Sequence, residues 1–136
     1  MTILAIGPAQ TRGFALSVFT EFDFESIVRG VDTAFAIIPD GSYVQGGRLS
    51  RTEAFDSSGG DDISVGDGDD DERFGDEDAQ VVGDTPLQQN LRARDLDDST
   101  TLFVVWNGSG TAATQGAANV NLLYADPNYQ TIIQDR

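Results

Sequence analysis

The stretch Ile63–Phe74, ISVGDGDDDERF, decides the fold of this chain, because a short apolar strand runs there directly into a cluster of glycines and acids. Ile63 and Val65 are two residues apart, which is the spacing of side chains on one face of a half-buried strand. Gly66 and Gly68 are expected to take positive φ angles and to bend the chain sharply. The chain before this turn then predicts strands that lead up to it, and the chain after it predicts strands that lead away.

The carboxylates of this turn cannot share a dry environment, because burying an unpaired charge is costly. The turn is therefore expected to face water, a cation or an arginine-bearing partner. Arg73 is the nearest positive charge, and Phe74 is expected to mark the return of the chain to the core.

Alternate aspartates in a glycine-bent loop also predict a candidate calcium site, formed by Asp67, Asp69 and Asp71. The EF-hand pattern does not fit, because Glu72 stands where that loop needs glycine and Asp78 stands where it needs glutamate. A calcium site of another kind remains one interpretation. The other is that these aspartates cap backbone amides within the turn and that the protein has no cofactor.

The overall composition is strongly acidic, with 23 acidic residues, eight basic residues and a net charge of -15 over 136 residues. Nucleic acid is not an expected partner, since binding it requires basic side chains that neutralise phosphates. An acidic surface also repels anionic membranes, and no stretch approaches the ~20 apolar residues of a membrane helix. The length is that of one domain.

Cysteine and histidine are both absent, and all eight basic residues are arginines. Thiolate nucleophiles, imidazole bases and ordinary zinc sites are thereby excluded, and no histidine or lysine is present to activate a serine. Pairs of carboxylates could in principle serve a glycosidase, but so many acids carry no information about such a pair. The sequence therefore predicts that the protein is not an enzyme.

Alternating apolar residues predict strands in the first half of the chain. Phe14 to Phe24 has period two, and Thr33 to Ile38 is apolar on both parities, which favours a strand covered on both sides. Pro39 to Ser42 predicts a turn, after which Tyr43 to Ala54 returns as a second arm. The glycine pair Gly46–Gly47 indicates a bulge or a close backbone approach in that arm.

The second half contains the strongest strand, Thr100 to Trp106, which is expected to be central. Asn107 to Gly110 predicts a turn, and the alternation from Ala118 to Tyr124 predicts the returning strand. The aromatic side chains Trp106 and Phe103 of the strong strand are interpreted as core or inter-subunit packing rather than as a platform for a sugar ring.

About six to eight short strands separated by Gly, Asp and Pro predict an all-β protein, an antiparallel β-sandwich with jelly-roll-like topology. We expect a single domain over residues 13–125, between an extended N-terminal arm, residues 1–12, and a C-terminal tail, residues 126–136. Apolar residues on such arms suggest a partner surface. The candidate partner-binding residues are Arg12, Tyr129, Ile132 and Ile133.

Several ordered segments resemble those of small tailed-bacteriophage virion structural proteins. The segments are EFDF at Glu21–Phe24, AFAIIPDGSYVQGG at Ala34–Gly47, SVGDGDDDERF at Ser64–Phe74, the TTLFV strand that begins at Thr100, and NGSGTAATQGAANVNLLYA at Asn107–Ala125. The VGDGDD turn is the specific part of the resemblance, which covers most of residues 21–125. Asp71 stands where that family often has proline.

The resemblance implies a virion structural protein of the phage head, either a capsid cement or decoration protein or part of a head fibre. Its implied partner is the major capsid protein, on the capsid surface, and it implies a homo-oligomer, with a trimer favoured over a dimer. Rigid strands, self-complementary faces and reaching arms would suit that role. The alternative is a receptor-binding or glycan-binding β-module of a head fibre or tail.

Overall fold

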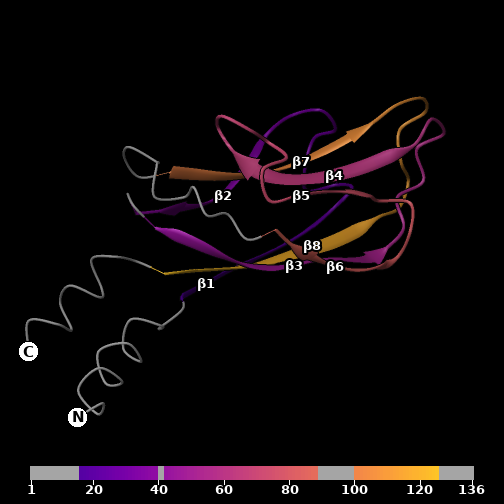
Figure 1. The fold of residues 1–136 in the computed structure, drawn as a ribbon. Helices are drawn as coiled ribbons and strands as arrows, with labels where there is room; N and C mark the ends of the chain where they lie inside the picture. The colour runs from indigo at the N-terminus through magenta and orange to yellow at the C-terminus, as the bar shows by residue number, and fades with distance from the viewer. Residues whose placement is uncertain (1–15, 40–41, 89–99, 126–136) are drawn as a thin grey trace, which may run out of the picture.

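The computed structural model describes residues 16–39, 42–88 and 100–125, which form two four-stranded antiparallel sheets packed face to face (Figure 1). The strands are β1 (Leu16–Asp23), β2 (Thr33–Ile38), β3 (Tyr43–Glu53), β4 (Asp61–Asp67), β5 (Gly75–Asp78), β6 (Gly83–Leu87), β7 (Thr100–Gly108) and β8 (Ala117–Ala125). The prediction of an antiparallel β-sandwich is therefore confirmed. No helix in these three ranges is long and apolar enough to span a membrane.

The strand pairing is nested around the turn between β4 and β5. β4 pairs with β5, β3 with β6, β2 with β7 and β1 with β8, so the chain resembles one long hairpin whose tip is that turn. Further pairing of β3 with β8 and of β4 with β7 gives the sheet orders β1-β8-β3-β6 and β2-β7-β4-β5. This is the jelly-roll arrangement, and it confirms the role expected for Ile63–Phe74.

The core lies between the two sheets, and it is filled by alternate residues of the strands. In β8, Val120 and Leu122 are fully buried and Asn121 between them is exposed, as the alternation of side chains along a strand requires. Phe55 and Phe74, which lie in the connections before β4 and before β5, are also buried. Phe74 thus returns to the core as expected. β7 lies between β2 and β4, so the strongest predicted strand is an inner strand.

Three local expectations were wrong. β2 is an edge strand and is not covered on both sides, since Ile37 is 67% exposed. The predicted return from β2 to β3, and that from β7 to β8, do not form hairpins, because in each case the second strand belongs to the opposite sheet. Turn residues look alike whether a connection closes a hairpin or crosses to the other sheet.

The glycine pair of β3 does form a bulge, with a register shift between Val44 and Gly46. Gly46 and Gly47 have φ angles of 124° and 141°, which side chains with a Cβ rarely adopt. A Cβ on Gly47 would also collide with the backbone oxygen of Asn121 on β8. The bulge therefore depends on glycine because the two strands approach each other closely there.

Four connections share one end of the sandwich, on the right in Figure 1. They are the links β1–β2, β3–β4, β5–β6 and β7–β8, residues 24–32, 54–60, 79–82 and 109–116. We refer to them together as the loop end. The turn between β4 and β5 lies at the opposite end.

Candidate functional site

The predicted acidic turn is anchored by Asp67, the last residue of β4, which is only 2% exposed. Its Oδ1 accepts hydrogen bonds from the backbone N–H groups of Asp69 and Asp70, each at 3.0 Å. Its Oδ2 accepts a hydrogen bond of 2.6 Å from Nε of Arg73. The buried charge is therefore paired with an arginine of the same turn and caps two backbone amides.

The three candidate calcium ligands have different surroundings. Asp67 is buried, Asp69 is exposed and Asp71 is half-buried. Within the described ranges, no group of three or more acidic side chains is arranged to hold a metal ion. The capping geometry of Asp67 supports the alternative interpretation of the turn. Calcium binding there stays a prediction.

Glycine is required at position 66 of the turn for a different reason than expected. Neither Gly66 nor Gly68 has a positive φ, so the expected left-handed conformations were wrong. A Cβ on Gly66 would instead collide with backbone atoms of Asp70 and Asp71, which fold back over β4. The turn therefore packs directly on the strand that leads into it.

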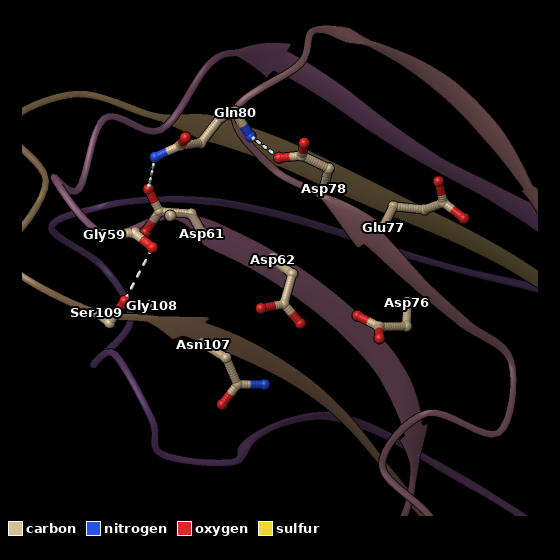
Figure 2. A pocket seen from close by; sticks show the side chains of 11 residues that line it. Gly59, Asp61, Asp62, Asp76, Glu77, Asp78, Gln80, Asn107, Gly108 and Ser109 are labelled. Atoms are coloured by element: carbon tan, nitrogen blue, oxygen red, sulfur yellow. Dashed lines mark hydrogen bonds between the residues drawn. The ribbon is translucent and has the colours of Figure 1, made fainter.

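An acidic depression of about 590 Å³ opens next to the loop end, away from this turn, on the outer side of the β5–β4–β7 sheet (Figure 2). Its lining includes side chains of β4, β5 and β7, with a wall from the loop end. The residues that line it are Gly59, Gly60, Asp61, Asp62, Asp76, Glu77, Asp78, Gln80, Asn107, Gly108 and Ser109. None of the arginines in the described ranges is among them.

Asp62 and Asp76 face one another across this depression, as Figure 2 shows. Asp62 pairs in register with Asp78, and Asp76 pairs with Ser64, so the two carboxyls are diagonal neighbours on one sheet face. Burial raises the pKa of Asp62, and the hydrogen bond and charge of Asp76 raise it further, to about 6. The pKa of Glu72, in the turn, is also raised, chiefly by the charge of Asp76.

The buried residue Asp61 connects the loop end to the core. Its Oδ1 accepts from Nε1 of Trp106 at 2.7 Å, and its Oδ2 accepts from the backbone N–H of Ser57 and from Nε2 of Gln80, each at 2.8 Å. Burial by itself raises the pKa of Asp61, but the hydrogen bonds from Ser57, Trp106 and Gln80 outweigh burial and leave it below its ordinary value.

A second aspartate of the loop end, Asp56, fixes the β7–β8 connection. Its carboxylate accepts hydrogen bonds from the backbone N–H and the hydroxyl of Thr114, at 2.7 and 2.9 Å, and from the backbone N–H of Gln115. The Thr114 bonds are the main reason why the pKa of Asp56 is lowered. Arg29, from the β1–β2 connection, also donates to Ser57 and Gly110. The loop end is therefore tied together by polar contacts.

Apolar side chains are nevertheless exposed at the loop end. The exposed valines are Val28 and Val31 in the β1–β2 connection, and Val81 and Val82 in the β5–β6 connection, each more than half exposed. Away from the loop connections, Phe19 of β1, which is 57% exposed, and Leu123 of β8 are exposed on the β1-β8-β3-β6 sheet. Such residues on a rigid framework are candidates for contacts with another protein.

Trp106 belongs to the core, as the sequence suggested. It is 3% exposed and lies 4.9 Å, between ring centroids, from Phe55. Buried indole cannot stack on a sugar, so Trp106 offers no glycan platform. Phe103, on the outer side of β7, is half-buried.

The predicted partner-binding residues Arg12, Tyr129, Ile132 and Ile133 lie outside the described ranges, as do both predicted arms. The sequence does not single out Asp61 and Asp62, because both stand in a run of Asp, Ser and Gly whose composition is typical of a loop. One available signal was Trp106, since a buried indole N–H usually has an acceptor. The sequence does not indicate which acid provides it.

No protein-family model and no curated protein matches this sequence. Solved structures do match the fold, and three of them are phage capsid structures. A chain of the cyanophage Pam1 capsid asymmetric unit is 15% identical, with a TM-score of 0.63, over 83% of this chain and 85% of that chain.

The other two structures agree with the first. A chain of the acid-stable capsid of Helicobacter pylori bacteriophage KHP30 is 18% identical, with a TM-score of 0.62, over 85% of this chain and 90% of that one. A chain of the capsid of Ralstonia phage GP4 is 14% identical, with a TM-score of 0.57, over 85% and 86%. At these identities the likeness shows a shared fold.

Proposed function

We propose that this protein is a structural component of a bacteriophage virion, which binds the outside of the capsid shell as a cement or decoration protein and bridges neighbouring subunits. The observation that carries the proposal is the likeness to chains of three phage capsid structures, which spans 83–85% of this chain and 85–90% of those chains. The partner would be the major capsid protein, and the protein would act as a homo-oligomer, with a trimer favoured.

The chemistry of the chain supports a binding role. A cement protein needs no nucleophile or general base, and the sequence has no cysteine, histidine or lysine. Rigid strands and exposed apolar side chains are what adhesion between subunits requires. The exposed valines of the loop end, Val28, Val31, Val81 and Val82, supply such contacts among the described residues. The arms, residues 1–12 and 126–136, would supply others.

The test is a phage particle that lacks this protein. Particles without it should assemble and then lose resistance to heat or osmotic shock, and adding the purified protein back should restore that resistance. Unaltered particle stability would count against a cement role. Cryo-microscopy of complete particles should show hundreds of copies on the shell, whereas a few copies on a fibre or tail would favour the receptor-binding alternative.

A residue-level test uses binding of the purified protein to shells that lack it. The double variant Val81→Ser/Val82→Ser should bind these shells more weakly while its melting temperature is unchanged, because both side chains are exposed. The matched control is Ile37→Ser, which removes an exposed apolar residue from edge strand β2, away from the loop end. Equal binding of both variants and the wild type would remove the loop end from the contact.

A further inference from the structure

The edge strand β5 combines a weak attachment with a high density of charge. It is only four residues long, with the sequence GDED, and it pairs with β4 alone. Arg51, which is 7% exposed, donates to the backbone oxygen of Asp78 at 2.8 Å, and the N–H of Ala79 donates to the backbone oxygen of Asp61. β5 is therefore held at its far end by these bonds, and Phe74, just before its start, is buried and accepts from the backbone N–H of Gln88 at 2.7 Å. The β5 residues in between depend on the ladder with β4.

The acids along this ladder gather on one face. Asp62 and Asp76 point toward each other in Figure 2, and Asp78 is the direct register partner of Asp62. Glu72 adds charge from the turn, and Asp61 adds charge from the adjacent position of β4. On the β7 side the register partner of Asp62 is Asn107, which is uncharged.

No cation compensates these carboxylates within the described ranges. Of the arginines there, Arg29 and Arg51 donate to backbone and hydroxyl oxygens, and Arg48 and Arg73 pair with acids outside the group, Asp84 and Asp67. Two carboxylates in such a position repel each other unless one of them holds a proton, which then forms a hydrogen bond to the other.

We propose that Asp62 and Asp76 form a proton-dependent clasp, in which one shared proton ties β5 to β4, and whose loss loosens β5 at this edge of the sheet. The clasp is closed in mildly acidic solution and opens as the pH rises toward neutrality and above.

The direction of the effect follows from the raised pKa of Asp62, about 6 in the folded protein against an ordinary value of 3.8. The folded state binds this proton more tightly than the unfolded state does. The contribution of this proton to stability is therefore greatest below the ordinary pKa, falls as the pH rises from there, and is lost above about 6. This is opposite to the usual behaviour of a paired carboxylate.

The direct test is a titration of the aspartate side-chain carboxyl signals by NMR in the full chain. The proposal expects the Asp62 carboxyl to show a titration step near pH 6. Hydrogen exchange, corrected for its intrinsic pH dependence, should show amides of β5 losing protection across the same range while those of β8 do not. If the Asp62 carboxyl titrates near its ordinary value of 3.8, the clasp does not exist.

A substitution tests the same point through stability. Asp62→Asn removes the charge and supplies an N–H that can bond to Asp76 without a proton, so its melting temperature should be nearly constant from about pH 5 to about pH 8. The wild type should lose a few degrees over this interval. Glu21→Gln removes one charge from the exposed side of β1, on the other sheet, and should keep the wild-type slope. A wild-type slope in Asp62→Asn would overturn the proposal.

Discussion

The indole Nε1 of Trp106 donates a hydrogen bond of 2.7 Å to Oδ1 of Asp61, which joins inner strand β7 to the first residue of β4. Both residues are almost fully buried, at 3% and 6% exposure. The second oxygen of Asp61 accepts from Ser57 and Gln80 in the loop end. One buried carboxylate therefore connects the hydrophobic core to the β3–β4 connection and to the β5–β6 connection, which carries the exposed Val81 and Val82.

We predict that Asp61→Asn lowers the free energy of unfolding at neutral pH by about 1–3 kcal/mol, because an amide cannot accept on both sides and one N–H donor is left facing another. Chemical denaturation measures the loss. The matched control is Asp62→Asn, the same change one residue along, which should not destabilise the protein at that pH. Equal losses in the two variants would contradict the distinct roles of these neighbours.

The same carboxylate predicts behaviour in acid. The pKa of Asp61 lies below its ordinary value of 3.8, so its contribution is fully present above that pH and is lost as the pH falls through the lower folded pKa. Thermal melts should therefore show a steep loss of stability below about pH 4 in the wild type and a shallower one in Asp61→Asn. If the wild type and Asp61→Asn lose stability equally steeply in acid, the hydrogen bonds to Asp61 do not favour its charged form.

Replacing each glycine of the turn between β4 and β5 with alanine should have different effects on stability. Gly66→Ala should cost about 1–3 kcal/mol, because its Cβ would push the backbone of Asp70 and Asp71 away from β4. Gly68→Ala should be nearly neutral, since the nearest atom to its Cβ is a ring carbon of Phe103 at 4.0 Å. Equilibrium denaturation of both variants measures the difference. A comparable loss in the two would mean that glycine is needed for backbone freedom instead of close packing.

Two ion pairs among the described residues, Arg73–Asp67 and Arg48–Asp84, differ in burial, and burial should decide how much each contributes to the free energy of unfolding. Arg73→Leu leaves the 2% exposed carboxylate of Asp67 without its cation and should cost about 3 kcal/mol or more. Arg48→Leu breaks an exposed pair with Asp84, whose side chains are 60% and 56% exposed, and should cost about 1 kcal/mol or less. Urea denaturation provides both values, and an equal cost would argue against the buried pair as an anchor.

The nested fold could be predicted in part, because the turn between β4 and β5 is recognisable in the sequence. Val65 followed by the acidic glycine turn marks the hairpin between β4 and β5, and alternation marks β1 and β8. The partners of those strands could not be predicted, because β1 and β8 meet across most of the chain. Non-local pairing depends on packing of the whole core, which no local pattern of residues encodes.

The acidic depression could not be predicted from the sequence. Asp62 and Asp76 become neighbours only through the register of β4 and β5, and a shift of one residue would turn one of them to the opposite face. An acidic composition indicates that carboxylates must meet somewhere. It does not indicate which of them remain exposed, which are capped, as Asp67 is, and which lie opposite another acid.

Calcium provides the last test, at the turn where alternate aspartates first suggested it. Both oxygens of Asp67 already accept hydrogen bonds, from Asp69 and Asp70 at Oδ1 and from Arg73 at Oδ2. A calcium ion would have to displace the guanidinium from a buried carboxylate. We therefore predict that neither a chelator nor millimolar calcium moves the melting midpoint, with magnesium as the control for ionic strength. A rise specific to calcium that disappears in Asp69→Asn would establish the site and would show that the arginine can be replaced.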